Sequence, residues 1–373
     1  MENLGTLGFS EEQADLLDGA ARFCADKSPM ETVRKLMASD AGFDEGVWKE
    51  IGELGWLGVA IPEEFGGVGL TLAEVAPIME SMGRSMLTGP FFATTLAGQA
   101  ILAGGSEDQK SALLPEIAAG AAASLALSEP GGGWDLGAIA TTATRDGDGF
   151  RLSGAKTFIM DGRAARLLVL SAMLDGAPVL FFVNSDAIPG EAWRRETIID
   201  ETKRSYALSL NGVRVSKDSL APPEKAGAAL AHIDLAANLL ASAEMTGACA
   251  ACIDYTLDYL RTRKQFGRAI GSYQALKHPS VDIYTEYEQA RSHLYAAAHS
   301  FNDQGAGEVA TRMAKAQALK TLSFASDRSI QFHGGFGFTY DCDAQLYRRR
   351  AAWHASQFGD EAHQRRRLAE LLF

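Results

Sequence analysis

The spacing of hydrophobic residues divides the chain into a helical beginning, a strand-rich middle and a long helical end. Apolar residues recur three and four positions apart through most of residues 9–120, which is typical of amphipathic helices. Ser10 followed by Gln13 predicts a capping box at the start of the first helix. The stretch VAIPEEFGGVGL, residues 59–70, is rich in Pro and Gly and predicts a loop between two helices.

The period changes near residue 123. Short segments rich in β-branched and aromatic residues follow one another, separated by turn signals such as DGDG and NG, and no helical stretch intervenes. We therefore expect an antiparallel β-domain. Its strands are expected within residues 149–162, 165–173, 177–184, 192–198 and 206–218.

Helical spacing returns near residue 225 and continues to residue 373. Long helices are expected at 228–262, 274–302 and 306–333, and their apolar faces without a heptad repeat favour a four-helix bundle. The predicted fold class is therefore α+β in three parts. These are an N-terminal α-helical domain (1–122), a middle antiparallel β-domain (123–225) and a C-terminal helical bundle (226–373).

Composition and charge limit the classes of function. Hydrophobic residues make up 47% of the chain and charged residues 22%, as in an ordinary globular protein. The formal net charge of -12 argues against a nucleic-acid partner, so any polyanion site has to be local. We see no signal peptide and no run of the roughly 20 apolar residues that a membrane span needs. We therefore expect a soluble, cytoplasmic protein with no membrane partner.

Two cysteines form the only pattern that suggests a metal. Cys249 and Cys252 make a C-x-x-C pair, a spacing that redox and zinc sites use. The pair lies inside the Ala-rich helical stretch ASAEMTGACAACIDYTLDYL, with no second ligand pair nearby. We interpret both as small residues packed within a helix and expect no metal site.

Five motifs together point to a known family. They are AIPEEFGGVGL (60–70), ALSEPGGGWD (126–135), LSGAKTFIMDG (152–162), YLRTRKQFGRAIGSYQALKH (259–278) and IQFHGGFGF (330–338). In this order and spacing the sequence resembles the acyl-CoA dehydrogenase family over essentially its whole length. The resemblance implies FAD as cofactor, an acyl-CoA thioester as substrate and an electron-transfer flavoprotein as electron acceptor.

The resemblance gives the basic segment RTRKQFGRAIG a role in binding the cofactor. In the family an Arg of this segment crosses the subunit interface and faces the FAD pyrophosphate of a neighbouring subunit, which implies that role for Arg263. A planar guanidinium suits bidentate contact with phosphate. The alternative is a basic turn exposed to solvent. The resemblance also implies that Phe266, Gln274, Gln331, Gly334 and Gly335 line the adenine and pyrophosphate half.

The flavin ring is expected to rest on the β-domain. The resemblance implies that Leu127 and Ser128 bond the ring and that Phe158 stands where the family usually has a Trp beside it. For Phe158 the alternative is core packing. Two positions depart from the family: Met160 replaces a Thr whose hydroxyl reaches flavin N5, and Trp134 replaces a small hydroxyl residue.

The catalytic base is the third departure. Removing an α-proton needs a carboxylate in a dry site that raises its pKa. At the position of the family's usual base stands Gly359, and at the position that a minority uses stands Ala237. Glu244, two helical turns after Ala237 among apolar neighbours, is the first candidate. Its alternative is a structural pairing with an Arg or a buried hydroxyl. Asp360 and Glu361 follow as candidates, and Asp234 is a poorer third.

These departures resemble a bacterial branch that supplies the smaller subunits of α2β2 acyl-CoA dehydrogenases for bulky substrates such as steroid side chains. Three interpretations stay open. The chain catalyses α,β-dehydrogenation of a bulky or non-linear acyl-CoA in catabolism, as a homo-oligomer or within a heterotetramer. Alternatively, it is a non-catalytic partner subunit that completes a heteromer. The third interpretation is a flavin oxidase or monooxygenase of the same fold.

Overall fold

The computed structural model describes residues 11–373, and side chains from residue 14 onward. The predicted capping box of Ser10 and Gln13 lies outside the described side chains. The helical beginning is confirmed. Its helices are α1 (Glu11–Lys27), α2 (Met30–Met37), α3 (Glu45–Glu53), α4 (Leu72–Arg84), α5 (Phe91–Gly104) and α6 (Glu107–Ala118).

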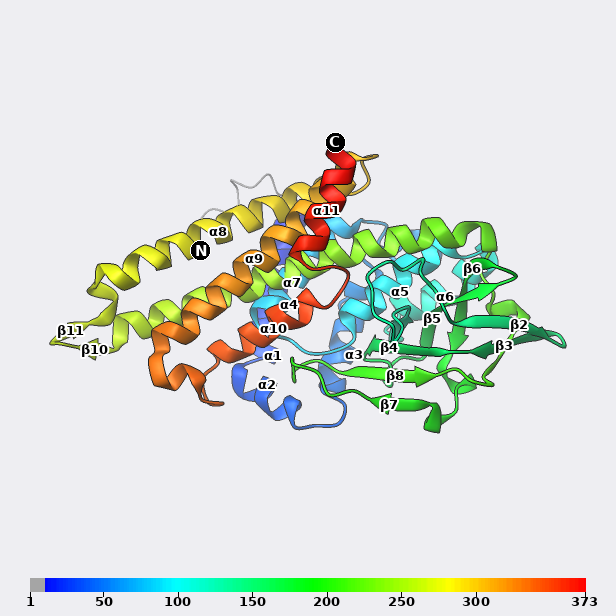
Figure 1. Ribbon diagram of the computed structural model, residues 1–373, viewed down its shortest axis with the longest axis horizontal. Coiled ribbons are helices and arrows are strands. Elements are labelled where there is room, and N and C mark those ends of the chain that lie inside the picture. The colour runs from blue at the N-terminus through cyan, green and yellow to red at the C-terminus, as the bar shows by residue number, and fades with distance from the viewer. Residues whose placement is uncertain (1–10) are drawn as a thin grey trace. The chain divides into compact units, whose positions relative to one another are not determined.

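The strand-rich middle forms two sheets (Figure 1). The first has six strands, and in it β5 is the centre, with β1, β2 and β6 as its partners. The second has three strands in the order β4-β8-β7. The six are β1 (Ala123–Ala126), β2 (Thr142–Asp146), β3 (Gly149–Ser153), β5 (Leu167–Leu174), β6 (Ala177–Asn184) and β9 (Arg214–Ser216). The three are β4 (Ala155–Met160), β7 (Trp193–Arg195) and β8 (Ser205–Ser209).

Most strand pairs are antiparallel, as predicted, but two are parallel. Strand β5 runs parallel to both β1 and β2. Parallel neighbours need a long connection, and the chain between β1 and β5 supplies one because it contains β2, β3 and β4. Turn signals in a sequence report short hairpins and carry no information on such long returns. The sheet is therefore mixed rather than purely antiparallel.

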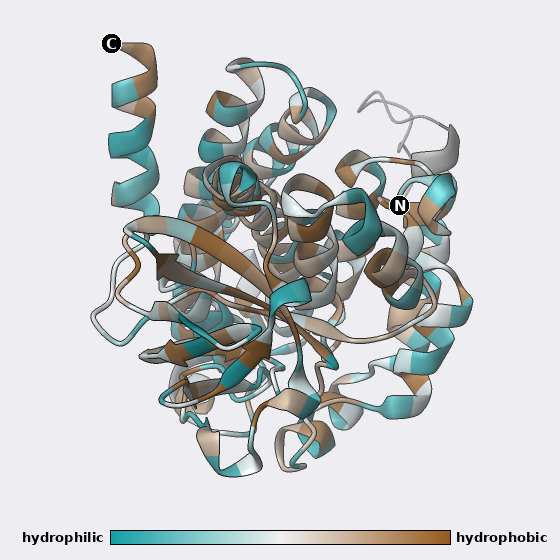
Figure 2. Ribbon diagram, turned by 90° about the vertical axis from the view of Figure 1, so that its right-hand side faces the viewer, coloured by the Kyte–Doolittle hydropathy of each residue, from teal (hydrophilic) through white to brown (hydrophobic). Residues whose placement is uncertain are grey.

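Strand β5 explains where the core of the middle region lies. Its sequence LLVLSAML is almost continuously buried, as in a central strand covered on both faces, while β6 and two further strands pair with its edges. Phe150 and Phe181 meet edge to face in this core, with ring centroids 5.3 Å apart. Figure 2 shows by colour that the central strands are hydrophobic (brown), whereas the helix that ends at the C-terminus is mostly hydrophilic (teal).

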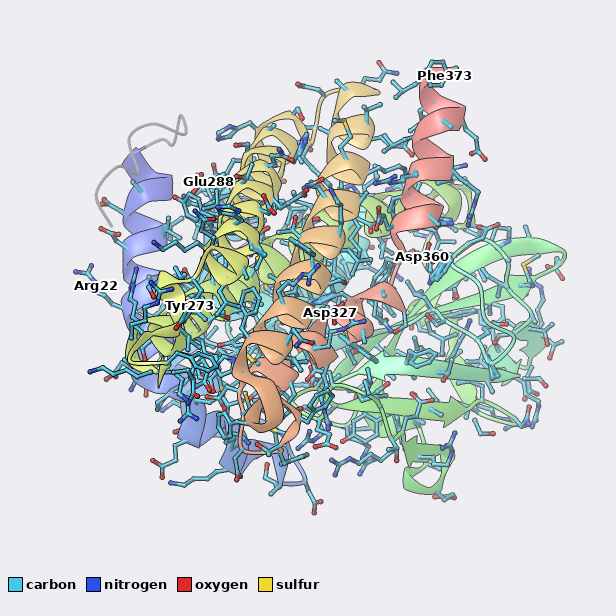
Figure 3. The ribbon with its side chains drawn as sticks, turned by 60° about the vertical axis from the view of Figure 1, so that its left-hand side comes forward. Arg22, Tyr273, Glu288, Asp327, Asp360 and Phe373 are labelled. Carbon is cyan, nitrogen blue, oxygen red and sulfur yellow. The ribbon has the colours of Figure 1, made fainter. Side chains whose placement is uncertain are left out.

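The helical end matches the predicted helices within two residues at each boundary. The long helices are α7 (Ala226–Thr262), α8 (Gln274–Ser300) and α9 (Ala306–His333), followed by α10 (Ala344–Ala355) and α11 (Glu361–Leu372). A two-stranded hairpin, β10 (Lys264–Gln265) with β11 (Arg268–Ala269), separates α7 from α8. Helix α9 packs along α8, α10 and α11 (Figure 3). The bundle part of the predicted fold class is thereby confirmed.

The described chain forms two compact units that interleave in sequence. One contains residues up to 34 with 73–87 and 238–373, and the other contains 35–72 and 88–237. The predicted domain boundaries at 122 and 225 stay predictions. Among the described residues, the helix Pro223–Thr262 is long and apolar enough to cross a membrane, and 67% of its apolar window is buried. One buried helix of this kind is weak evidence for a span, because core helices have the same composition.

Within the first unit, α4 and α7 cross with their backbones in contact. A Cβ added at Gly83 would lie 2.0 Å from the carbonyl oxygen of Glu244, and one added at Gly247 would lie 1.8 Å from that of Glu80. Both glycines are needed because no side chain fits between the two helices. Beside this crossing, buried Glu80 accepts hydrogen bonds from Arg291 Nε (2.8 Å) and from the Tyr295 hydroxyl.

Candidate functional site

A β-bulge in β4 organises the residues predicted to face a flavin ring. Lys156 pairs with Leu208 and Ile159 pairs with Tyr206, so Thr157 and Phe158 together oppose a single residue of β8. Phe158 has φ 52°, the left-handed region that non-glycine residues rarely adopt. Its side chain is 38% exposed. Core packing, the alternative offered for this residue, does not account for so exposed a ring.

Both amide groups of the bulge have partners. The Thr157 N–H donates to the carbonyl of Ser128 at 3.0 Å, and the Phe158 N–H donates to Glu196 Oε2 at 2.9 Å. Strand β4 is thereby joined to the segment that carries Leu127 and Ser128. The structure therefore brings three of the four predicted ring-facing residues together around the bulge.

A buried ion pair between Lys156 and Glu129 holds the segment that carries Leu127 and Ser128. Lys156 is fully buried, and its Nζ donates to Glu129 Oε1 (2.7 Å), Ser171 Oγ (3.0 Å) and the Leu127 carbonyl (3.3 Å). Burial alone would raise the pKa of Glu129, but hydrogen bonds from Lys156 and Thr141 outweigh burial and lower that pKa to about 2. Sequence reasoning missed this pair. The signal was a lysine inside the otherwise apolar strand AKTFIM.

Glu129 also joins the two ends of the glycine-rich loop 130–139. Its two carboxyl oxygens accept hydrogen bonds from the backbone N–H groups of Ala140 (2.8 Å) and Thr141 (2.9 Å). Within the loop, Gly132 and Gly133 have positive φ, and Trp134, the bulky departure, is half-buried. Met160, the other departure, is 8% exposed, and its carbonyl accepts a hydrogen bond from Ser124 Oγ.

The residues predicted to hold the pyrophosphate lie at one end of the helical bundle. Arg263 follows the last residue of α7 and is exposed, and Gln274 begins α8. Between them Phe266 (φ 53°) and Gly267 (φ 79°) form the two-residue turn of the hairpin β10–β11. Phe266 at the tip is 92% exposed. Tyr273, labelled in Figure 3 at the start of α8, braces the hairpin by donating its hydroxyl to the Gln265 carbonyl at 3.1 Å.

The glycine pair reaches the same end through the last turn of α9. His333 ends that helix and stacks on Tyr255 and Tyr259 of α7, with centroid distances of 4.8 and 4.2 Å. The next residues, Gly334 and Gly335, have nothing within 4 Å of where a Cβ would stand. Gln331 is exposed one turn earlier. All six residues predicted for this half of the cofactor are thereby placed at one end of one unit.

Glu244, the first candidate for the base, is paired with an arginine and lies close to a histidine. Its side chain is 2% exposed, its Oε1 lies 2.5 Å from Arg350 Nη1, and its Oε2 lies 3.2 Å from His354 Nε2. Arg350 and His354 stand four residues apart on one face of α10. The structural alternative for Glu244, pairing with an Arg inside the bundle, is what the structure shows. Its catalytic role stays a prediction.

Two of the remaining carboxyl candidates, Asp360 and Glu361, stabilise the start of α11. Asp360 caps that helix by accepting the His363 N–H at 2.7 Å, and Glu361 pairs with Arg365 at 2.6 Å (Figure 3). Both line a groove of about 590 Å³ formed by α9, α10 and α11. Gly359 has φ 97°, and an added Cβ would lie 2.4 Å from His363 Cδ2. A glutamate at this position would therefore be strained.

The two surfaces fit the two halves of FAD, each in its own unit. The bundle end offers an exposed guanidinium, an amide and a pair of glycines whose open space lets a phosphate approach the backbone. The bulge in β4 offers an exposed aromatic ring on a backbone joined to Ser128 by the Thr157 N–H, which suits a flat heteroaromatic ring. Among the described residues no cluster of three metal-ligating side chains exists.

Comparison with known proteins gives consistent matches. Models of the acyl-CoA dehydrogenase N-terminal, middle and C-terminal domains match residues 10–121, 124–199 and 235–373. The chain is 30% identical to acyl-CoA dehydrogenase IpdE2 of Mycolicibacterium smegmatis, covering 98% of this chain and 100% of that one.

Solved structures agree with this similarity. The Tcur3481-Tcur3483 steroid ACAD is similar with a TM-score of 0.86 and 31% identity, over 98% of each chain. A chain in the structure of the electron transferring flavoprotein of Acidaminococcus fermentans is similar with a TM-score of 0.87 and 28% identity, over 98% of this chain and 99% of that one.

Proposed function

The chain belongs to the acyl-CoA dehydrogenase family and is an oxidoreductase, and from that premise we propose that it acts on a bulky or non-linear acyl-CoA in catabolism. The observation that carries the substrate class is the similarity to a steroid ACAD along almost the whole chain.

The family fixes the reaction class, FAD-dependent α,β-dehydrogenation of a thioester; a bound flavin would supply the acceptor for the hydride that leaves the β-carbon, and a base would take the α-proton. The roles that we propose for residues of this chain concern holding FAD and do not depend on the hydride transfer. Arg263, Gln331 and the glycines at 334 and 335 hold the pyrophosphate half through charge and open backbone. Leu127, Ser128 and Phe158 hold the ring edge. Met160 supplies no hydroxyl to flavin N5, so hydrogen bonding at that atom depends on the backbone.

A second candidate function is that of a partner subunit in a heteromeric dehydrogenase. Two observations favour it. Gly359 and Ala237 stand at both family positions for the base, and the carboxyl of Glu244 is occupied by Arg350. The hyphenated name of the Tcur3481-Tcur3483 steroid ACAD denotes two gene products, which supports a heteromer by analogy. In this case the bundle end of our chain completes the cofactor site of the other chain.

One purification separates the two candidates. The chain is expressed alone and together with a second family member, taken from a neighbouring gene where one is present, and each particle is measured for mass and for visible flavin absorbance. A yellow homo-oligomer that is bleached by steroid-type acyl-CoA supports the dehydrogenase. A colourless particle that becomes yellow and active only in the co-expressed complex supports the partner subunit. Flavin-free particles in both cases would contradict both.

The electron acceptor can be tested with the same material. We propose an electron-transfer flavoprotein as the acceptor, and the comparison with the flavoprotein structure of Acidaminococcus fermentans supports it. Substrate-reduced enzyme should pass electrons to such a protein rapidly and react slowly with oxygen. Rapid release of peroxide instead would favour an oxidase of the same fold.

A further inference from the structure

We propose that Glu196 is a positioning residue that sets the Phe158 ring and ties it to Ser128 for contact with the flavin. The inference rests on the proposed function, because it assumes that this edge of β4 faces the flavin. Glu196 follows β7 and has no role in the family motifs on which the sequence analysis relied.

Glu196 gathers three donors from two strands. Its Oε2 accepts the Phe158 N–H at 2.9 Å and the Ser205 hydroxyl at 2.8 Å, and its Oε1 accepts the Thr157 hydroxyl. Thr157 and Phe158 are the two bulge residues of β4, and Ser205 begins β8. One carboxyl group thus accepts hydrogen bonds from both bulge residues and from the neighbouring strand β8.

This arrangement holds a conformation that Phe158 does not adopt by itself. A left-handed backbone is unfavourable for an aromatic residue and persists only where the surroundings enforce it. Such strain is explained by packing when the side chain is buried, but the Phe158 ring is 38% exposed. The strain therefore serves to present the ring outward, and Glu196 is the group that orients the Phe158 N–H.

The bulge also couples the ring to the neighbouring segment. The Thr157 N–H, one residue away, donates to the Ser128 carbonyl at 3.0 Å. Movement of the bulge would therefore displace Phe158 and Ser128 together. Glu196 sets both of these ring contacts through the backbone, without touching the flavin itself.

The test uses a matched pair of variants in the FAD-loaded protein, with its partner subunit if one co-purifies. Glu196→Gln keeps the reach of the side chain and removes the charge. Glu196→Asp keeps the charge and shortens the reach by one methylene. Glu191→Gln alters an exposed carboxyl close by in the chain and serves as the control. The dissociation constant of FAD and the visible flavin spectrum are measured beside thermal stability.

A positioning role predicts a definite order. Glu196→Asp should raise the dissociation constant of FAD about tenfold and shift the flavin band, because the Phe158 N–H loses its partner. Glu196→Gln should change it by less than about threefold, because an oxygen remains in place. The control should match the wild type. If the charge of Glu196 mattered instead of its reach, Glu196→Gln would weaken FAD binding more than Glu196→Asp.

Two results overturn the inference. If both variants bind FAD like the wild type with an unchanged spectrum, Glu196 does not position the ring. If Gln is worse than Asp, the charge rather than the geometry matters. A wild-type protein or complex that binds no FAD at all would overturn the proposed function and the inference with it, so the two failures are distinguishable.

Discussion

The bulge region of β4 and the exposed end of the helical bundle are both predicted to hold FAD, yet they are built in opposite ways. Around the bulge, each polar group described above has a partner within its own unit, through Lys156, Glu129 and Glu196. At the bundle end, Phe266 is 92% exposed and Arg263 stands in solvent.

The two regions differ in how far the free protein already prepares them to bind FAD. A surface whose donors and acceptors are already paired needs only the ligand to complete it. An exposed phenylalanine at the tip of a hairpin exposes apolar area to water at a cost until another surface covers it. The bundle end therefore needs a binding partner to cover its apolar surface, whereas contacts within the chain already order the bulge region.

The largest expected effect on stability comes from breaking the buried ion pair between Lys156 and Glu129. Lys156→Met should lower the free energy of unfolding by about 3 kcal/mol, because it leaves Glu129 without its cation in a poorly solvated place. Urea denaturation measures the change. Lys217→Met, at an exposed lysine, is the control. The double variant Lys156→Met, Glu129→Gln should recover part of the loss, and no recovery would show that the pair is not the cause.

The second prediction concerns Glu244. As a structural ion-pair partner, Glu244→Gln should destabilise the protein by about 2–3 kcal/mol, since Arg350 is left buried without its counter-charge. Adding Arg350→Met should restore stability, as measured by thermal unfolding. If instead the single variant keeps its stability and FAD but loses flavin reduction by substrate, Glu244 is the base.

The third prediction sharpens the contrast at the bundle end. Arg263→Ala should weaken FAD retention about tenfold by removing a charge-assisted phosphate contact. Because Arg263 is exposed, the stability of the FAD-free protein should not change. Arg261→Ala, two residues earlier and also exposed, is the control. Equal FAD retention in both variants would assign Arg263 to a solvent-exposed basic turn.

The smallest effect is a pH dependence. The pKa of Glu129 is lowered to about 2 in the folded chain, below its unfolded value, so its contribution is complete above pH ~4.5 and is lost as the pH falls toward 2. Glu129→Gln should remove that part of the acid dependence. The variant and the wild type are compared by unfolding at pH 7 and pH 3, and their difference should narrow at the lower pH. A constant difference would mean that Glu129 does not titrate in this range.

Much of the fold could be predicted because its information is local. The helices at 226–262, 274–300 and 306–333 repeat an apolar period that is visible over many turns. The two parallel pairings of β5 could not be predicted, since they join segments connected through other strands.

The site divides in the same way. Arg263, Gln331 and Phe158 could be proposed from the sequence because motifs carry them, and their roles stay predictions. Glu196 was not proposed because it lies far from Phe158 in sequence and meets it only because β8 pairs with both β4 and β7. The setting of Glu244 was read from its apolar sequence neighbours, whereas its actual partners, Arg350 and His354, come from another helix.

Gly83 and Gly247, at the crossing of α4 and α7, limit which residues these two positions accept. Each glycine faces a carbonyl of the opposite helix, so a methyl group at either position would push α4 and α7 apart. A side chain at Gly83 would displace the backbone of Glu244 on α7, and a side chain at Gly247 would displace the backbone of Glu80 on α4. Glu244 pairs with Arg350, and Glu80 pairs with Arg291. The two glycines therefore protect two different buried ion pairs at one helix crossing.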